Sequence, residues 1–438
     1  MLSFYQHQKL ALAYLRLNNS FALFMEQGTG KTLPVVKRML ELFRSGKAQN
    51  ALVVAPKAVV GSWWRDVEKF SPEEQKVLRR GMTVVSYDIV WRREEYRKHW
   101  SIIVLDESHK IKNHTTRRGK CLLQMALDSE YRYELTGTPI SNGALENIWS
   151  QFTFLEPVSA PRKQVYSKIF GGSYYAFLDR YAFLNQYHKP YRYRYVDELQ
   201  DIIAAHSYRV TKAECLDLPE KLPDEIYDIE MLEKKLYKEL HNDSTVEDMD
   251  ILASNPLTRM VRLRQVCSGF INDGSEDKPL KCEKLSALED FLDGWEKKLV
   301  IFCEFRRSID SVCVLLNKLK IKNVTLDGRQ KDKSVWKQFQ EDESVRVIVC
   351  QYQSANAGID LYAADTTIFY EPTLSSNILE QCRDRTHRIG QKQPCSYIHF
   401  LTVGTIEKAI YRALRGYTDF NEKLFTEYMH EYQKGVKY

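Results

Sequence analysis

The sequence predicts an α/β fold with two parallel sheets and a mostly helical segment between them. Short apolar runs typical of buried strands recur from residue 21 to residue 136 and again from residue 299 to residue 401, separated by charged amphipathic stretches. This alternation is typical of parallel sheets with crossover helices. The residues in between have helical spacing instead. A chain of 438 residues is also too long for one ordinary core, so we expect more than one domain.

The predicted elements divide the chain into four segments. The first set of strands covers residues 21–24, 51–55, 83–86, 102–105 and 133–136, and the second covers 299–302, 345–350, 366–370 and 396–401. Predicted helices cover residues 174–187, 196–206, 232–240 and 257–266, and predicted loops cover 242–250 and 272–279. We therefore expect a first lobe at residues 1–155, a helical insertion at 156–280, a second lobe at 281–415 and a helical tail at 416–438.

The composition restricts the class of protein. No apolar run approaches the length of a membrane helix, and the first residues include Lys9 and Arg16, unlike a signal peptide, so we expect no membrane association. The nine cysteines are scattered, without a Cys-x-x-Cys pair, which predicts reduced thiols and no structural metal. A net charge of +6 is compatible with a polyanionic partner but does not require one.

The first candidate site follows the first predicted strand. Gly28, Thr29, Gly30, Lys31 and Thr32 lie between that strand and a helical pattern. Glycines let backbone amides turn toward phosphates, and a helix N-terminus adds positive potential. The pattern predicts a nucleotide phosphate loop in which Lys31 reaches the β- and γ-phosphates and Thr32 coordinates Mg²⁺. A Gly-rich turn without ligand is the structural alternative.

A pair of carboxylates forms the second candidate site. The apolar run at residues 102–105 leads directly into Asp106 and Glu107. Phosphoryl transfer requires charge neutralisation and a positioned nucleophile. We therefore predict that Asp106 holds Mg²⁺ and that Glu107 orients and deprotonates the attacking water. A solvated acidic turn is the alternative reading.

Arg385 and Arg388 form the third candidate site. Their spacing of three places both side chains on one face of a helix. Two arginines in this arrangement suit the role of arginine fingers that stabilise a transferred phosphoryl group. By spacing alone, a solvated basic helix face is the favoured explanation.

Several stretches together resemble the motifs of one family, the Swi/Snf family of superfamily-two double-stranded DNA translocases. The sequence His-Arg-Ile-Gly-Gln at residues 387–391 is specific to this family, and the similarity runs from about residue 8 to about residue 411. The other stretches that resemble its motifs are residues 25–32, 54–57 with Trp63 and Trp64, 106–113, 135–142, 262–267 and 354–361.

The resemblance implies two RecA-like lobes that bind ATP and Mg²⁺ between them and move along duplex DNA without obligatory strand separation. It implies that Gln8 reads adenine and that Gly358 and Asp360 contribute to the nucleotide site. The chain departs from the family where Asn356 replaces Gly, where Asp360 replaces Asn, and where residues 374–376 replace Trp-Asn-Pro. We expect a minimal core of bacterial or phage type, acting in the cytoplasm, or in the nucleus if the source is eukaryotic.

Double-stranded DNA is the expected partner, and its contacts are predicted from cations and small donors. Residues 109–120 carry several cations and no acid, and other candidates follow strands or the fifth motif. Such groups suit phosphate contacts rather than base recognition. The predicted DNA-contacting residues are Lys57, Ser86, Lys110, Lys112, Arg117, Arg118 and Ser354. Residues 187–195 alternate aromatic and cationic side chains, for which an edge strand is favoured over a nucleic-acid grip.

Three other functions stay open at this point. A related enzyme could separate or anneal DNA strands as a helicase. A DNA-binding regulator could use ATP only as a switch. The chain could also be the motor subunit of a restriction or repair complex. DNA-stimulated turnover distinguishes a motor from a switch, and displacement of a triplex strand without unwinding distinguishes a translocase from a helicase.

Overall fold

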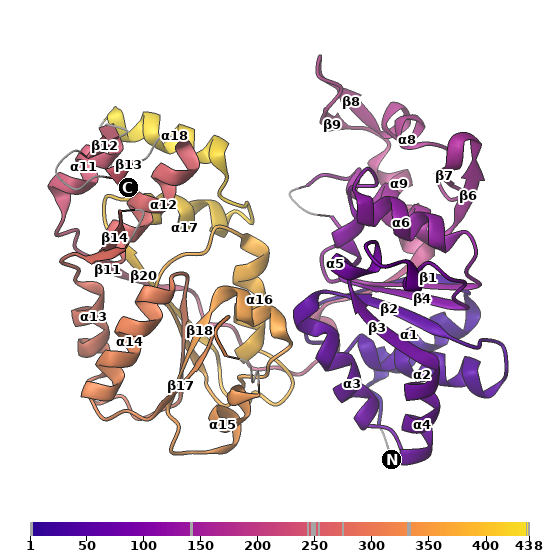
Figure 1. Cartoon of the computed structure of the whole chain (residues 1–438), viewed down its shortest axis with the longest axis horizontal. Helices are drawn as coiled ribbons and strands as arrows, with labels where there is room; N and C mark the ends of the chain where they lie inside the picture. Colours follow the sequence, from indigo (N-terminus) through magenta and orange to yellow (C-terminus); the bar gives the residue numbers. More distant parts are fainter. Residues whose placement is uncertain are drawn as a thin grey trace. The chain divides into compact units, whose positions relative to one another are not determined.

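The computed structural model describes residues 3–140, 143–242, 245–246, 251–252, 255–273, 276–330, 334–434 and 436. The chain divides into a first unit, Met1–Asp217, and a second unit, Leu218–Tyr438. Each unit contains one six-stranded sheet with helices on both faces (Figure 1). Within the described residues, no helix is long and apolar enough to cross a membrane.

The sheet of the first unit is parallel throughout, in the order β10-β1-β5-β4-β2-β3. One face is covered by helices α1 to α4 and the other by α5 to α9. The strands are β1 (Ser20–Met25), β2 (Ala51–Ala55), β3 (Met82–Ser86), β4 (Ile102–Asp106), β5 (Tyr131–Leu135) and β10 (Ser207–Val210). The helices are α1 (Gln6–Leu17), α2 (Thr32–Arg44), α3 (Val60–Glu68), α4 (Pro72–Gly81), α5 (Tyr87–Val90), α6 (Arg117–Ala126), α7 (Asn147–Leu155), α8 (Tyr174–Tyr181) and α9 (Val196–His206).

Burial on both faces explains why the central strands of this sheet are nearly continuous apolar runs. In β1, Phe21 and Leu23 pack under α1 to α4, whereas Ala22 and Phe24 pack under α5 to α9. The five strands predicted in this part of the sequence all exist, with bounds that differ by at most two residues.

The second unit repeats this architecture, with a parallel sheet in the order β11-β20-β19-β16-β18-β17. Helices α13 and α14 cover one face, and α11, α12 and α15 to α18 cover the other. The strands are β11 (Glu225–Ile229), β16 (Leu299–Cys303), β17 (Asn323–Leu326), β18 (Val347–Gln351), β19 (Thr366–Phe369) and β20 (Ser396–Thr402). The helices are α11 (Lys234–Asn242), α12 (Pro256–Cys267), α13 (Lys284–Leu292), α14 (Arg306–Lys318), α15 (Val335–Glu341), α16 (Ser376–Thr386), α17 (Ile406–Arg415) and α18 (Glu422–Gln433).

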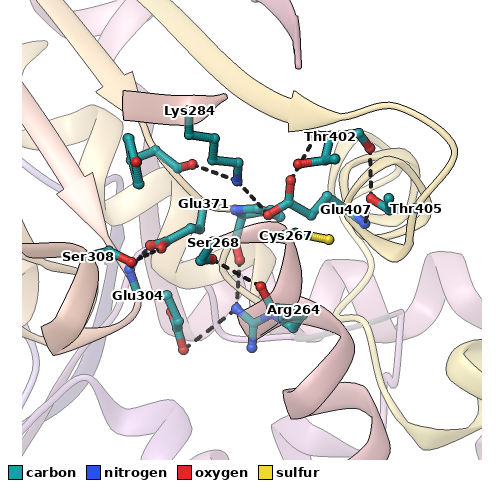
Figure 2. A network of polar contacts seen from close by, with 12 residues as sticks. Arg264, Cys267, Ser268, Lys284, Glu304, Ser308, Glu371, Thr402, Thr405 and Glu407 are labelled. Atoms are coloured by element: carbon teal, nitrogen blue, oxygen red, sulfur yellow. Dashed lines mark hydrogen bonds and ion pairs between the residues drawn. The ribbon is translucent and has the colours of Figure 1, made fainter. Parts of the chain in front are cut away.

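A buried polar network ties these helices to the strand ends of the second sheet (Figure 2). The fully buried Lys284 of α13 lies 2.6 Å from Glu407 of α17 and donates to the Tyr370 carbonyl at 3.0 Å. Beside it, Glu371 accepts from the Glu304 amide at 2.8 Å. Because an unpaired buried charge is costly, the network fixes α13 and α17 against the end of β19.

The predicted helical insertion at residues 156–280 does not form a separate body, because the division at Asp217 and Leu218 falls inside it. Strand β10 joins the first sheet beside β1, and β11 joins the second sheet beside β20. The tail predicted at residues 416–438 is also part of a larger core, since Phe425 and Tyr428 of α18 are buried in the second unit. The predicted boundaries therefore differ from the division that the structure shows.

Four predicted segments can be compared with the structure in detail. The helix predicted at residues 196–206 is α9, whereas the helix predicted at 174–187 ends at Tyr181, because β8 (Ala182–Leu184) then pairs with β9 (Pro190–Tyr193). This hairpin confirms the strand reading for part of residues 187–195. The loop predicted at 272–279 includes a hairpin of β14 (Phe270–Asn272) and β15 (Asp277–Pro279). Of the loop predicted at 242–250, residues 243–244 and 247–250 lie outside the described residues.

Candidate active site

The strand order of the first sheet brings the predicted site residues to one edge. Strand β5 lies between β1 and β4, and all three are parallel, so their carboxyl ends meet at the same edge. The phosphate loop follows β1, the acidic pair ends β4, and Thr136 and Gly137 follow β5. Ligands of open α/β sheets bind at this edge.

The phosphate loop requires glycine at two positions. Gly28 and Gly30 have φ angles of 82° and 76°, which side chains with a Cβ rarely adopt. A Cβ on Gly30 would also lie 2.4 Å from Gln8 Nε2. Lys31 follows, and Thr32 begins α2. The backbone amides at the start of α2 have no partner within the helix, so they are available to an anion.

Two side chains from α1 hold this loop. The ring of His7 contacts the Thr29 carbonyl at 2.8 Å through Nε2, and Gln8 Nε2 donates to the Gly30 carbonyl at 3.1 Å. Both side chains are buried. In this structure the side chain of Gln8 therefore stabilises the phosphate loop through its backbone. The contact of Gln8 with adenine stays a prediction.

The acidic pair lies beside the loop. Lys31 Nζ is 3.5 Å from Glu107 Oε1, and Trp63 Nε1 donates to Asp106 Oδ2 at 2.9 Å. Burial, reinforced by the neighbouring Glu107 carboxylate, raises the pKa of Asp106. Burial alone would raise the pKa of Glu107 as well, but Lys31 and His109 outweigh it and hold that pKa below its ordinary value. Glu107 is therefore the more acidic member of the pair and is ionised at neutral pH.

Glu107 is held in position by two side chains, Thr136 at the end of β5 and His109 in the turn after β4. It adopts a left-handed backbone conformation with a φ of 55°. Thr136 Oγ1 donates to Glu107 Oε2 at 3.3 Å, and His109 Nδ1 lies 3.3 Å from the same oxygen. A Cβ on Gly137 would be 3.2 Å from the Gln27 amide nitrogen, so the turn after β5 packs directly against the phosphate loop.

These groups fit a nucleotide with Mg²⁺. Thr32 and Asp106 offer hard oxygen ligands, which Mg²⁺ prefers, and Lys31 offers a cation for phosphate oxygens. Among the described residues, no cluster of three or more His, Cys, Asp or Glu side chains forms an all-protein metal site. A metal held partly by substrate phosphates matches this donor set.

The second unit brings together the residues of the fifth and sixth motifs. Gly358, with a φ of 64°, ends the turn after β18, and α16 packs against this turn. Arg388 forms an ion pair with Asp360 and donates to the Ile359 carbonyl at 3.1 Å. The Arg385 carbonyl accepts from the Leu361 amide at 2.9 Å. The two motifs therefore contact each other through Arg388 and Asp360 and through the backbone of Arg385, and the part of these residues in nucleotide binding stays a prediction.

Arg385 is half-buried, as is Arg388. Burial, followed by the neighbouring charge of Arg388, lowers the pKa of Arg385 to about 10. Its Nε has no hydrogen-bond partner among the described residues. An anion at this position would satisfy that donor and offset the repulsion between the two guanidinium groups.

The predicted DNA contacts divide into exposed and buried groups. Lys57, Lys110, Lys112 and Arg117 are exposed and Arg118 is half-buried. Ser86 and Ser354 are only 3% and 8% exposed. Ser86 ends β3 and Ser354 lies in the turn after β18, and burial keeps both side chains from presenting a hydroxyl to a phosphate in this structure.

Sequence reasoning did not assign a role to Trp63, His7 or Thr136. Each lies within or beside a motif, but its partner is 22 to 43 positions away in the sequence. The packing of α1 and α3 against the sheet and the register of β4 beside β5 bring these pairs together. Ser141 and Asn142, at the end of the third motif, lie outside the described residues.

Enzymes that hydrolyse ATP with two RecA-like lobes carry a phosphate loop and an acidic pair on one sheet and arginines on the other. The chain falls into this helicase-like class of ATP hydrolases. A model of the SNF2-related domain matches residues 5–269, and a model of the helicase conserved C-terminal domain matches residues 283–390. The first match covers more than half of the chain, so the chain belongs to the SNF2-related family.

Relatives occur in distant organisms. The chain is 26% identical to an uncharacterized ATP-dependent helicase of Mycoplasma genitalium over 92% of its own length and 40% of that protein. It is 26% identical to the chromodomain-helicase-DNA-binding protein 1-like of Danio rerio over 88% and 40% of the two lengths. The SWI2/SNF2 ATPase core of Sulfolobus solfataricus in complex with dsDNA aligns over 97% of this chain and 92% of that one, with 23% identity and a TM-score of 0.45. The chain spans less than half the length of these two curated relatives.

Proposed function

We propose that the chain is an ATP-driven translocase that moves along double-stranded DNA without obligatory strand separation. The observation that carries the proposal is the contact of Lys31 with Glu107 beside Asp106, at the sheet edge where the phosphate loop begins. This arrangement supports the proposal, because Lys31, Glu107 and Asp106 of an SNF2-family chain lie where a phosphate-binding cation, a base and a metal-binding carboxylate would be needed.

The residues of the first unit divide the chemistry between them. Lys31 and the amides at the start of α2 bind the phosphates. Glu107, ionised at neutral pH and oriented by Thr136 and His109, accepts the proton of the attacking water. When bound, Mg²⁺ neutralises phosphate charge and orients the transferred group. Thr32 and Asp106 would hold it, and Trp63 fixes the orientation of the Asp106 carboxylate.

Arg385 and Arg388 of the second unit complete the reaction. We expect them to act on the γ-phosphate, whose oxygens gain charge in the transition state. The ion pair of Arg388 with Asp360 supports this, because it orders the Arg388 guanidinium beside the fifth motif before a phosphate binds. Closure of the two units on the nucleotide, and opening after hydrolysis, would then move them along the DNA.

Cations of the first unit, four of them exposed and one half-buried, supply the track contacts in this proposal. Lys57, Lys110, Lys112, Arg117 and Arg118 offer charges to phosphates, which carry no base information. Movement independent of sequence follows from such contacts. Gln8, Gly358 and Asp360 complete the proposed nucleotide site, and Ser86 and Ser354 are left out of the track because they are buried.

The test is the rate of ATP hydrolysis without nucleic acid and with single-stranded DNA, closed duplex DNA or duplex RNA. Closed duplex DNA should stimulate turnover most, and displacement of a triplex strand should accompany hydrolysis. Glu107→Gln is the inactive reference. A rate that no nucleic acid changes would contradict the motor and favour the switch. Stimulation by single strands alone would favour a helicase.

A further inference from the structure

The first unit contains a large cavity that lies on the α5 to α9 side of its sheet, away from the phosphate loop. Its volume is about 1490 Å³. Its walls are the segment at residues 91–99, residues 114–128 at and around α6, Trp149 of α7, the hairpin residues 162–166 and residues 173–175 at the start of α8. We call this cavity the basic groove. Figure 1 shows that α6, α8 and the β6–β7 hairpin lie on the same side of the sheet.

The charge of the basic groove is strongly one-sided. Seven Lys or Arg side chains line it, against the single carboxylate of Asp128. None of these seven forms an ion pair with a carboxylate among the described residues. Arg97 donates to the Trp91 carbonyl at 2.7 Å, which orders the side chain without neutralising it. Uncompensated cations in a concave surface focus a positive potential, so the groove suits a polyanion.

The tip of the hairpin adds cations at some conformational cost. Strands β6 (Pro157–Ala160) and β7 (Gln164–Ser167) pair with Ala160 opposite Gln164, so residues 161–163 form the turn. Arg162 and Lys163 both have positive φ angles, 57° and 58°. Consecutive left-handed residues are usually Asn or Gly, and each long side chain in this conformation is strained. The chain therefore presents two cations to the groove where uncharged residues would fit the backbone better.

Aromatic side chains lie among these cations. Trp91 has the guanidinium groups of Arg92 and Arg117 5.0 and 5.5 Å from its ring centroid. The ring of Tyr174 is 4.4 Å from His114, whose pKa is lowered by burial and then by Lys120. Tyr175 is 76% exposed at the groove wall. Planar aromatic and guanidinium groups between cations are the surface on which unpaired bases stack.

We propose that the basic groove binds an unpaired strand of nucleic acid, as a second site beside the duplex track. A duplex keeps its bases stacked on one another, so it can use the cations of the groove but not the exposed face of Tyr175. An unpaired strand uses both, with phosphates on the cations and bases on the rings. This inference rests on the proposed function only because it takes DNA as the ligand of the chain. If the groove binds an unpaired strand, the preferred substrate is branched DNA, that is, a duplex with an unpaired flank.

Direct binding in the absence of ATP tests the proposal. Fluorescence anisotropy of labelled oligo-dT and oligo-U, and of a hairpin-closed DNA duplex, gives the affinity of each probe and distinguishes a DNA strand from an RNA strand. Tyr175→Ala should weaken binding of the single strand about 5- to 150-fold and leave the closed duplex nearly unchanged. The matched control is Tyr417→Ala, which removes a tyrosine that is 72% exposed in the second unit.

A second variant tests the cations. Arg162→Ala with Lys163→Ala should shrink the salt dependence of oligo-dT binding by about 0.7 for each phosphate that is no longer neutralised. Lys234→Ala with Lys235→Ala, which removes two exposed cations of α11, is the control. Equal losses of affinity for closed duplex and single strand, or unchanged single-strand affinity in both groove variants, would overturn the proposal. Because binding is measured without ATP, loss of hydrolysis in Lys31→Ala tests the proposed function separately.

Discussion

Lys31 Nζ and Glu107 Oε1 lie 3.5 Å apart, so the cation that we propose to bind phosphate and the carboxylate that we propose as the base contact each other. The contact has two consequences. It holds the pKa of Glu107 low, which keeps the carboxylate ionised. It also means that phosphate must compete with Glu107 for Lys31, so binding of the nucleotide leaves Glu107 free to accept a proton.

Substitutions at this pair should separate binding from hydrolysis. Lys31→Ala should abolish turnover, because the phosphates lose their cation. Glu107→Gln should still bind ATP but hydrolyse it poorly, because an amide does not accept a proton. Binding of a fluorescent ATP analogue and steady-state hydrolysis measure the two properties. Near-normal turnover in Glu107→Gln would remove Glu107 as the base.

The two arginines of the second unit should affect turnover more than affinity. Arg385→Ala or Arg388→Ala should lower turnover by about 10³- to 10⁵-fold, as for other arginine fingers. ATP affinity should change much less, since the charge that they meet is largest in the transition state. Arg307→Ala, at an exposed position on α14, is the control. Equal losses in turnover and affinity would assign the arginines to simple nucleotide binding.

The central strands are predictable from the sequence, but three of the four edge strands, β10, β11 and β17, are not. β2 and β4 are buried on both faces, so their apolar runs identify them. In β11 only Ile229 is buried, and Glu225 and Asp228 are exposed, so no apolar pattern marks this strand. The sequence pattern therefore places β10 and β11 in a helical insertion, although each completes a sheet.

The candidate site shows the same limit. Lys31, Asp106 and Glu107 are identifiable because phosphate chemistry restricts residue type and spacing over a few positions. Trp63 is not, because its bond to Asp106 joins α3 to the end of β4 and so depends on how α3 packs against the sheet. The ion pair of Arg388 with Asp360 joins two motifs and likewise depends on the packing of α16 against the turn after β18.

Because of the buried Glu134, we expect the free energy of unfolding to depend on pH. Its side chain is fully buried in β5, and neither carboxylate oxygen has a hydrogen-bond partner among the described residues. Burial raises its pKa well above the ordinary value. The folded state therefore binds a proton that the unfolded state releases, and stability falls as pH rises from the unfolded pKa toward the folded one.

Glu134→Gln removes this titration. Relative to the parent chain, the variant should gain free energy of unfolding on the order of 1 kcal/mol per pH unit across that window. Urea denaturation of both proteins at about pH 5 and about pH 8 measures the difference. A difference that is the same at both pH values would show that Glu134 is ionised in the folded state.

The exposed cations that follow Glu107 should contribute to the salt dependence of the affinity for duplex DNA. If Lys110 and Lys112 contact DNA phosphates, then replacing both by Ala should shrink the slope of log affinity against log salt for duplex DNA by about 0.9 for each phosphate that is no longer neutralised. The Lys234→Ala, Lys235→Ala double variant should leave the slope unchanged. An unchanged slope in the Lys110, Lys112 variant would assign these lysines to solvated surface.

The last prediction is that the strands of the duplex stay paired during movement. A motor that contacts phosphates needs only charged surfaces, whereas opening base pairs also needs a side chain that inserts between them, at a cost of unstacking for each step. Two tryptophans of the first unit are candidates for such an inserting side chain. Trp100 is 3% exposed and donates to the Tyr96 carbonyl at 2.8 Å, and Trp91 lies against Arg92 and Arg117. Trp100 is therefore not free to insert between base pairs, and Trp91 is half-buried.

A forked duplex with one labelled strand decides between the two modes. The chain should hydrolyse ATP on this substrate and displace a triplex strand from its duplex arm, without releasing the labelled strand. The unpaired arms should increase affinity through the basic groove, and Tyr175→Ala should remove this increase while duplex-stimulated turnover persists. Robust ATP-dependent release of the labelled strand would contradict the translocase and establish a helicase. In that case the exposed Tyr187 and Tyr191 of the β8–β9 hairpin would be the first residues to replace, because they are the most accessible aromatic side chains of that segment.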